Sequence, residues 1–258
     1  MSETTPSNRS GKKVANQYER GYDYTKYWEN RDYEHAAEEH ALRTLLKRKH
    51  YNHAADIGGG FGRLCLVLRE YADKVTLAEP AASQLEAAKT VLAGTDIQMV
   101  QTQADDLAFP SGSLDLVTMV RVMHHIPEPS KEFSEIYRVL RQGGTAIIEV
   151  ANYGHYKNRR AFKKAGKQLP TEPVSIRTVT ADEPDAIPFV NHNIDTVTKA
   201  LQDEGFKIIN KLSVSNLRSE KLKKVLPTGL MLAIEKPLQR RLAKNDFGPS
   251  IFLELRKR

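Results

Sequence analysis

The sequence contains one cysteine and no long apolar run, and both shortages limit what the chain can be. A single thiol, Cys65, excludes an intramolecular disulfide and any chemistry that needs two cysteines. No stretch reaches the roughly 20 apolar residues of a membrane-spanning helix. Residues 1–16 also lack the apolar core of a signal peptide. We therefore expect a reducing compartment and a cytoplasmic protein.

The length and composition indicate one globular domain with room for a lid. The chain has 258 residues, of which 40% are hydrophobic, and this is enough to bury a core. We expect residues 1–16, which are polar and lack apolar periodicity, to form a disordered leader. Residues 17–258 are then a single domain.

The net charge of +7 is concentrated in two segments. Residues 151–171 contain six Lys and Arg residues and no acid, and residues 236–258 contain seven against two acids. Such runs are usually solvated faces, although they can also bind the phosphates of a nucleic acid. RNA is therefore kept as an alternative partner.

A glycine-rich turn at residues 58–62 follows a short apolar strand and precedes a helical pattern over residues 61–72. Gly58, Gly60 and Gly62 allow a close approach of the backbone to a ligand. The free N–H groups of a following helix would point at that ligand. This arrangement predicts a nucleotide cofactor.

Two further residues narrow the type of cofactor. The dinucleotide fingerprint would need a third glycine where this chain has Arg63, and this argues against a nicotinamide dehydrogenase. Glu79 ends the next apolar strand, where a carboxylate can accept hydrogen bonds from both hydroxyls of a ribose.

Strand and helix patterns alternate along the chain and predict an α/β fold with a doubly wound, mostly parallel sheet of seven strands. The ligand should lie at the carboxyl ends of the strands, where Asp56, Glu79, Arg121 and Asn152 should converge. The expected strands cover residues 54–56, 75–78, 97–101, 114–120, 145–150, 206–214 and 250–256, and the main helices residues 33–48, 61–72, 81–93, 130–140 and 195–204. Alternation at period two favours residues 250–256 over residues 230–234 as the seventh strand, and Ser130 can cap the helix that begins there.

The spacing Asp-x-Gly-x-Gly-x-Gly from Asp56 resembles motif I of the class I S-adenosylmethionine (SAM) methyltransferases. Four later stretches resemble successive motifs of the type 11 methyltransferase family. They are residues 103–110, 113–117, 122–127 and 138–144, and the resemblance covers residues 54 to about 150. It implies a Rossmann-like class I methyltransferase with SAM as its cofactor.

The resemblance also implies roles for single residues. Glu79 would hold the ribose and Arg121 would start the loop beneath the methionine moiety, and the other residues implied at the cofactor are Asp56, Gly58, Gly60, Gln103 and Ala104. Gly58 and Gly60 would line the methionine end. The family usually has Gly-Asp-Ala where this chain has Thr102-Gln103-Ala104, so an amide takes the place of the carboxylate that binds the adenine amino group. The Gln103 carbonyl oxygen can still accept that hydrogen bond.

Catalytic residues are harder to assign. A general base is needed only for a hydroxyl or a protonated amine, and Tyr153, His155 and His192 are weak candidates from their places after the strands. In the resembling family the pair His124-His125 belongs to a structural loop, and no third ligand at metal spacing accompanies it. No metal site is expected.

Two segments outside the shared motifs should shape the substrate site. Residues 151–190 are basic and proline-containing and are interpreted as a lid. Residues from about 217 to 243 are expected to be a helical insertion, in which Leu230, Ile234, Leu238 and Leu242 recur every four residues. The aromatic segment from Tyr18 to Trp28 is either packing material or a flap over the cofactor.

The leading hypothesis is a SAM-dependent methyltransferase that acts by in-line displacement on a small or medium-sized acceptor. One alternative is an RNA methyltransferase that uses the basic lid and tail. Another is a SAM-binding protein without catalysis, which the Gln103 departure suggests.

Overall fold

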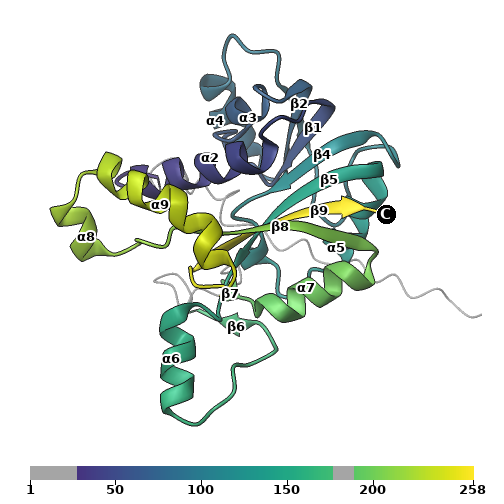
Figure 1. Cartoon of the computed structure of the whole chain (residues 1–258). Helices are drawn as coiled ribbons and strands as arrows, with labels where there is room; N and C mark the ends of the chain where they lie inside the picture. Colours follow the sequence, from purple (N-terminus) through teal and green to yellow (C-terminus); the bar gives the residue numbers. More distant parts are fainter. Residues whose placement is uncertain (1–27, 177–188) are drawn as a thin grey trace, which may run out of the picture.

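A computed structural model of the chain describes residues 28–176 and 189–258 (Figure 1). The predicted leader and most of the aromatic segment, including Tyr18, Tyr22, Tyr24 and Tyr27, lie outside the described residues. Within them, seven strands form one sheet in the order β3-β2-β1-β4-β5-β9-β8. The predicted class, an α/β fold with a doubly wound, mostly parallel seven-stranded sheet, is confirmed.

The five strands from β3 to β5 run parallel to one another, and β9 lies antiparallel between β5 and β8. The strands are β1 (Tyr51–Ile57), β2 (Ala72–Glu79), β3 (Gln98–Gln101), β4 (Leu114–Met119), β5 (Leu140–Ala151), β8 (Phe206–Val214) and β9 (Ser250–Lys257).

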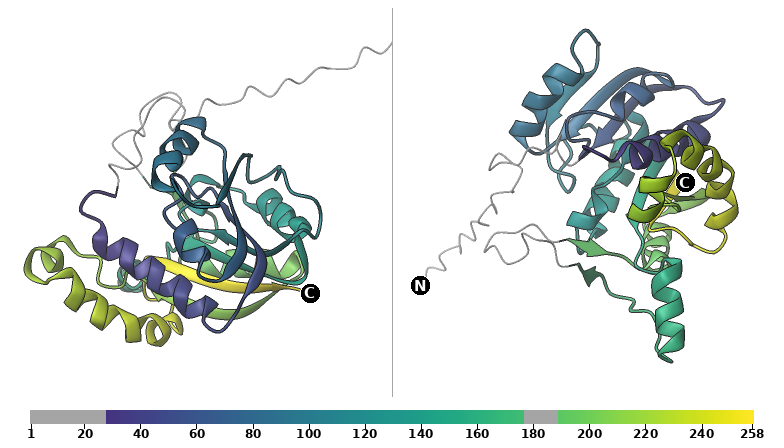
Figure 2. Two further views of the ribbon diagram at one scale, coloured as in Figure 1. Left: turned by 90° about the horizontal axis from the view of Figure 1, so that it is seen from above. Right: turned by 90° about the vertical axis from the view of Figure 1, so that its left-hand side faces the viewer.

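Helices cover both faces of the sheet (Figures 1 and 2). On one face, α2 (Asp32–Leu46), α3 (Cys65–Leu68) and α4 (Ala82–Val91) pack with the strands into one apolar cluster. On the other face, α5 (Ser130–Val139) and α7 (Ile194–Asp203) form a second cluster. Adjacent residues of β1 divide between the two, since Ala54 belongs to the first cluster and Ala55 to the second. Burial on both faces explains why consecutive residues such as Ala54 and Ala55 are both apolar.

The helix expected over residues 61–72 is wrong in extent, because α3 covers only Cys65–Leu68. The residues before it form a turn in which Gly62 N–H donates to Gly59 O and Cys65 N–H to Gly62 O. Glycines at positive φ do not propagate an α-helix. At the other end, β2 already begins at Ala72.

Helix α5 also starts differently from the prediction. Ser130 is its first residue rather than its cap, and Pro129 occupies the cap position without a side-chain hydrogen bond. In contrast, Asn193 caps α7 by accepting a hydrogen bond from the N–H of Asp195 at 2.9 Å.

The last strand is the one that period-two alternation predicted. Residues 250–257 form β9, which pairs with β5 on one side and β8 on the other. Two helices, α8 (Glu220–Val225) and α9 (Thr228–Ala243), occupy the chain between β8 and β9. Pro237 lies inside α9.

The segment after β5 carries α6 (Tyr156–Lys164) and then β6 (Val174–Ser175), which pairs with β7 (Val190–Asn191). Figure 1 shows α6 standing away from the sheet, and no residue of α6 is buried. None of the described helices is long and apolar enough to cross a membrane. The assignment of residues 151–190 as a lid stays a prediction.

The position of β9 inside the sheet leads to a stability prediction. Leu253 is fully buried in the second apolar cluster, so Leu253→Ala should lower the free energy of unfolding by about 2–5 kcal/mol. Arg256 on the same strand is exposed, and Arg256→Ala should change it by less than about 0.5 kcal/mol. Urea unfolding of both variants measures the difference, and equal losses would contradict the buried position of β9.

Candidate functional site

The glycine turn after β1 lies at the carboxyl edge of the sheet. Gly58, Gly60 and Gly62 all have positive φ, at 63°, 59° and 82°. The N–H of Gly58 donates to Ala78 O at 2.7 Å, which ties the turn to β2. A Cβ atom at position 58 would lie 2.5 Å from Cγ2 of Val122, so no side chain fits there. The turn therefore presents bare backbone at this edge.

Glu79, at the end of β2, reaches the same turn. Its Oε2 accepts a hydrogen bond from Gly60 N–H at 2.9 Å, and its Oε1 accepts one from Ala81 N–H at 3.0 Å. Burial raises the pKa of Glu79 to about 7, although both backbone N–H groups act in the opposite direction. Each oxygen of the ionised group keeps capacity for a further hydrogen bond, as a ribose diol would require.

Asp56 lies beneath the turn rather than beside it. The side chain is buried, and its Oδ1 accepts a hydrogen bond from Thr118 Oγ1 at 2.6 Å. Its Oδ2 accepts from Cys65 Sγ at 3.7 Å, and a Cβ atom on Gly59 would lie only 2.6 Å from this oxygen. Burial raises the pKa of Asp56 to about 6. The geometry gives Asp56 a supporting role under the glycine turn.

Arg121 turns its side chain away from the predicted ligand position and toward α2. Its Nε and Nη2 donate to Oε1 of Glu38 at 2.6 Å and 2.5 Å. Arg63 of the glycine turn donates to Oε2 of the same carboxylate at 2.5 Å. Burial raises the pKa of Glu38, but the two guanidinium groups outweigh it and hold the pKa below its usual value. Only the backbone of Arg121, which has φ 63°, can therefore contribute to the loop beside the predicted ligand.

Glu38 is the residue that the sequence analysis missed. It is fully buried, but α2 contains several acidic residues, and the sequence does not distinguish the buried acids from the solvent-facing ones. Arg63 and Arg121 gave a weak signal, because two cations in the loops around the predicted cofactor site call for a buried acidic partner.

Trp28, at the start of the described chain, covers this ion cluster. The Cζ atom of Arg63 lies 3.7 Å from the Trp28 ring centroid, and that of Arg121 lies at 5.9 Å. Both distances are within the range of cation–π attraction. In the described part of the aromatic segment, the indole therefore packs on guanidinium groups.

Gln103 follows β3 close to Glu79, since the N–H of Thr102 donates to Glu79 O at 3.3 Å. The Gln103 side chain is exposed, and its backbone pairs with Asp106 in an isolated bridge. Ala104 is partly buried and packs against the second apolar cluster. The amide is thus open to solvent near the carboxyl edge, where an adenine could reach it.

His192 is fixed by the backbone. Its Nε2–H donates to Met123 O at 2.9 Å, and its own N–H donates to Ala151 O at 2.8 Å. The side chain is buried, and burial lowers the pKa of His192. This imidazole holds the 3-10 turn η1 (Met123–His125) against the end of β5, which is a structural task.

Tyr153 and His155 follow β5 and are both partly buried. The N–H of Tyr153 donates to His192 O at 2.8 Å, so the structure brings two of the three candidate bases together through the backbone. Burial, followed by Lys157 and Arg159, lowers the pKa of His155.

The neighbouring pair His124-His125 packs with Phe189, at ring distances of 4.4 Å and 5.5 Å. Among the described residues, no group of three His, Cys, Asp or Glu side chains could hold a metal ion.

Asn152 does not join the predicted crevice. Its amide is buried and donates to the carbonyl oxygens of Asp246 and Gly248, both at 2.9 Å. These bonds fix the turn that leads into β9. The expected convergence therefore holds for the glycine turn and Glu79, whereas the side chains of Arg121 and Asn152 are bound elsewhere.

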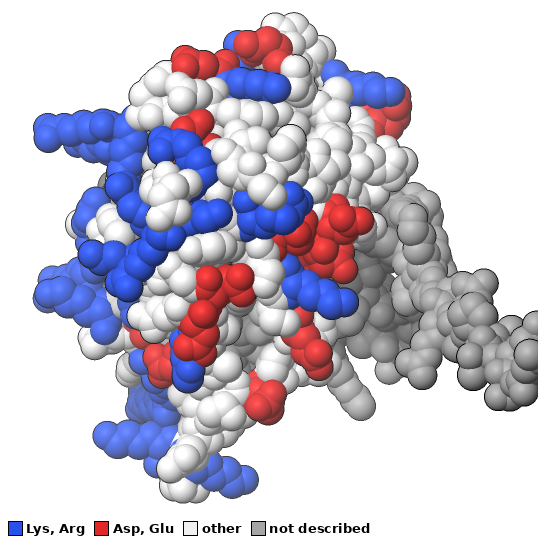
Figure 3. Space-filling model, turned by 90° about the vertical axis from the view of Figure 1, so that its right-hand side faces the viewer, with Lys and Arg blue, Asp and Glu red and all other residues white. Residues whose placement is uncertain are grey.

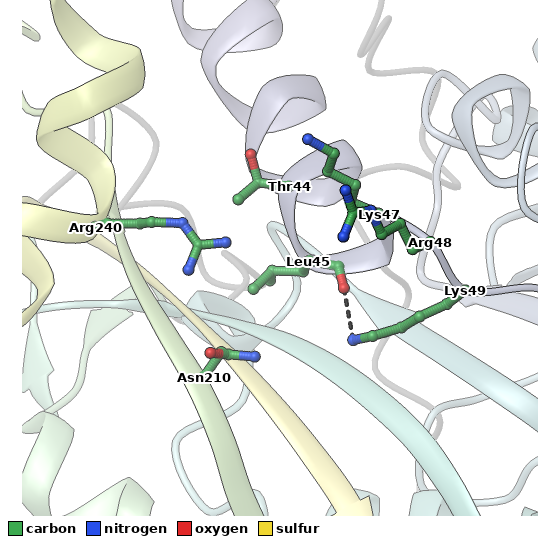
Figure 4. Close-up of a pocket in the computed structure, with 7 residues that line it drawn as sticks. All are labelled: Thr44, Leu45, Lys47, Arg48, Lys49, Asn210 and Arg240. Atoms are coloured by element: carbon green, nitrogen blue, oxygen red, sulfur yellow. Dashed lines mark hydrogen bonds between the residues drawn. The ribbon is translucent and has the colours of Figure 1, made fainter.

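A basic pocket of about 360 Å³ lies apart from these residues, between the end of α2, β8 and α9 (Figure 4). Its lining consists of Thr44, Leu45, Lys47, Arg48, Lys49, Asn210 and Arg240. Lys49 is occupied by internal bonds to Leu45 O and Glu254. None of the predicted cofactor residues lines this pocket.

The Glu38 cluster yields a stability prediction. Glu38→Gln keeps the side-chain shape but leaves two largely buried guanidinium groups without their counter-charge, so unfolding should become easier by about 3 kcal/mol. The adjacent Glu39 is partly exposed and pairs with Arg43, so Glu39→Gln should cost less than about 1 kcal/mol. Chemical denaturation compares them, and a Glu38→Gln loss no larger than the control would refute the role of this cluster.

Comparison with known proteins adds independent information. A family model described as a methyltransferase domain matches residues 55–148. A 2-methyl-6-phytyl-1,4-hydroquinone methyltransferase of Oryza sativa subsp. japonica is 31% identical over 103 residues, which is 38% of this chain and 31% of the relative. A ubiquinone/menaquinone biosynthesis C-methyltransferase of Hahella chejuensis is 32% identical over 100 residues, or 36% of this chain and 40% of the relative. The match spans about a third of the length of such relatives.

Solved structures share the fold. A Listeria monocytogenes protein provisionally assigned as an SAM-dependent methyltransferase superposes with a TM-score of 0.61 at 18% identity, covering 87% of this chain and 98% of that protein. A [4+2]-cyclase superposes with a TM-score of 0.55 at 19% identity, covering 84% and 81%. Since a cyclase shares the fold, the fold alone does not define the reaction. Together with the motifs, the family match identifies residues 55–148 of this chain as a methyltransferase domain.

Proposed function

We propose that the protein is a SAM-dependent methyltransferase that acts on a small, apolar, hydroxyl-bearing ring such as a hydroquinone. The observation that carries this proposal is the contact between Glu79 and the glycine turn, inside the part of the chain that matches the methyltransferase domain. The contact unites a diol-binding carboxylate with bare backbone at one edge of the sheet.

The cofactor would lie along this edge. Glu79 would accept the ribose hydroxyls, Gln103 would accept the adenine amino group, and Gly58 and Gly60 would pass beneath the methionine end. Bound SAM supplies a sulfonium methyl group that is ready for displacement. The Asp56 carboxylate, sealed under the turn, would keep the loop in place without touching the ligand.

The protein's task in such a displacement is alignment. The acceptor atom forms a bond to the methyl carbon, the carbon–sulfur bond breaks, and the electron pair stays on sulfur while the acceptor loses a proton. Holding the reacting atoms in line can contribute roughly 7–11 kcal/mol. A neutral imidazole can take the proton, and the lowered pKa of His155 keeps it neutral near pH 7. His192, bonded to Met123 O, is less suited to this role.

The acceptor class rests on the relatives. The two relatives described above are named for hydroquinone and quinone methylation, and each matches this chain over only part of its own length. A small-molecule acceptor is the general form of the proposal, and a hydroquinone is its specific form.

RNA methylation is the alternative that the charge distribution supports. Figure 3 shows Lys and Arg side chains gathered along one side of the molecule and around its lower end, where α6 lies. Binding of RNA through these cations would weaken steeply with salt. The shared fold with a cyclase keeps a SAM-binding role without methyl transfer as a further alternative. A cytoplasmic location is also part of our proposal, although several plant relatives are named as chloroplastic.

A transfer assay tests the function directly. Incubation of the protein with SAM carrying a labelled methyl group and a methylated benzohydroquinone should give labelled ring product. Gly58→Arg should abolish it, because a side chain at this positive-φ position would clash with Val122 and distort the glycine turn. Labelling of RNA but not of the hydroquinone would favour the RNA alternative. Tight SAM binding with no labelled product from either acceptor would favour the role without catalysis.

Cofactor affinity should depend on pH through Glu79. The ionised carboxylate is the form that accepts two hydroxyl hydrogens, and burial places its pKa at about 7. Affinity for S-adenosylhomocysteine should therefore be full above pH 8 and fall as the pH drops below 7, by up to about tenfold per pH unit. Glu79→Gln should bind more weakly and lose this dependence. Calorimetry from pH 5.5 to 8.5 measures the affinity of the wild type and of Glu79→Gln. The same pH dependence in both proteins would refute the assignment of Glu79 to the ribose.

Adenine binding gives a separate prediction. Gln103→Ala should weaken binding of S-adenosylhomocysteine by about 0.5–1.5 kcal/mol, the net value of one neutral hydrogen bond. Gln103→Asp should keep or improve the affinity because it restores the carboxylate usual in the family. The control is Gln101→Ala, since that amide donates to Pro80 O. Unchanged affinity in both Gln103 variants would show that adenine is bound elsewhere.

A further inference from the structure

Helix α9 buries two polar side chains and exposes two large apolar ones in its first half. The buried positions are Met231, Glu235, Gln239 and Ala243. Leu230 is 49% exposed and Ile234 is 40% exposed. The first half of the four-residue repeat of Leu and Ile in this helix therefore faces outward.

Specific hydrogen bonds fix this orientation. Glu235 Oε2 accepts from Tyr33 OH at 2.8 Å and from Asn216 N–H at 3.1 Å. Gln239 Nε2 donates to Ala37 O at 2.9 Å. Rotating the helix to bury Leu230 would break these bonds and leave buried polar groups unpaired, which is costly.

The short helix α8 extends the exposed apolar surface. Val225 is 78% exposed and Leu222 is 36% exposed. Together with Leu230 and Ile234 they form what we call the hairpin face. These four make up nearly half of the nine large apolar side chains that are exposed in the described part of the chain, although the face spans only 13 residues. Such clustering marks an interaction surface.

The charges around the hairpin face are of one sign. Glu235 is the only acidic residue between positions 221 and 244, and it is buried. Three exposed cations lie within two residues of these apolar side chains in sequence, namely Lys221, Lys224 and Lys236. Arg240, Arg241 and Lys244 are exposed farther along α9, and Arg240 lines the basic pocket. The partner should therefore be both apolar and anionic.

The hairpin belongs to the edge of the sheet that carries the cofactor site. Strands β5 and β8 both run antiparallel to β9, so their carboxyl ends share one edge. The chain leaves this edge after Val214 and rejoins it at Ser250. Figure 1 shows α8 and the start of α9 projecting beyond the sheet, and the right-hand view of Figure 2 shows the hairpin facing the viewer.

We propose that the α8–α9 hairpin docks the protein on the surface of an anionic phospholipid bilayer. An exposed apolar face flanked by Lys and Arg is the pattern of helices that lie in the interface of a membrane. Each cation near an anionic surface adds roughly 1 kcal/mol of attraction. A second copy of the chain is a poorer partner, because a two-fold contact would place the same cations against each other. If the proposed function holds, an apolar acceptor could pass from the bilayer to the adjacent site.

Vesicle sedimentation tests the docking. The full chain should sediment with vesicles of phosphatidylglycerol and phosphatidylcholine, stay in solution with phosphatidylcholine alone, and be released by high salt. The double variant Val225→Asp/Ile234→Asp should weaken binding at least about tenfold, since it removes the inserted side chains and adds charge of the wrong sign. Val91→Asp is the matched control, since Val91 is 38% exposed on α4, and it should bind like the wild type.

The charge contribution has its own pair of variants. Lys221→Glu/Lys224→Glu should reduce binding strongly, whereas Lys74→Glu/Lys207→Glu, at exposed sites of β2 and β8, should reduce it far less. Unchanged melting temperatures show that each variant is folded.

Three results would overturn the proposal. They are no binding to anionic vesicles, equal losses for hairpin and control variants, and losses in the Lys variants with full binding by Val225→Asp/Ile234→Asp. The last result would indicate a purely electrostatic surface, such as one for RNA. The assay contains neither cofactor nor acceptor, so its outcome is independent of whether methyl transfer occurs.

Discussion

The buried carboxylate of Glu38 joins three segments that are far apart in the sequence. It lies on α2 and binds Arg63 from the glycine turn and Arg121 from the loop after β4. Moving a carboxylate from water into a protein interior costs several kcal/mol unless cations and hydrogen bonds compensate. If either arginine moved away, the buried charge of Glu38 would be compensated less and the structure would be destabilised. The two loops that border the cofactor edge are therefore positioned together, and α2 fixes both.

Buried polar contacts continue from α2 to α9. Tyr33 and Ala37, which lie on α2 one turn apart, bind Glu235 and Gln239, which are likewise one turn apart on α9. Burial raises the pKa of Glu235, so this contact is not held by a strong opposite charge. Apolar burial alone would have favoured the Leu and Ile side of α9. The observed orientation satisfies the hydrogen bonds to α2 and leaves Leu230 and Ile234 available for another surface.

The sequence was sufficient for the sheet and for part of the site. Period-two alternation predicted β9, and the acid at the end of an apolar strand predicted Glu79 beside the glycine turn. The sequence was insufficient to predict the role of Glu38. An acid within a helix is normally solvated, and the burial of Glu38 depends on arginines that are distant in sequence. The orientation of α9 was hidden for a similar reason. Helical periodicity defines two faces, but it does not determine which one meets a partner when that partner offers hydrogen bonds.

Two buried carboxylates at the cofactor edge differ in what surrounds their oxygens. Those of Asp56 are enclosed by the side chains of Thr118 and Cys65, and those of Glu79 accept from backbone N–H groups of the loop itself. Backbone donors at a loop surface leave room for a ligand hydroxyl on the same oxygens, whereas a side-chain enclosure under the strand does not. Hydrogen bonds to the ionised form lower a pKa. A bound diol should therefore shift Glu79 toward ionisation and release a proton near pH 7, while the pKa of about 6 for Asp56 stays where burial has set it.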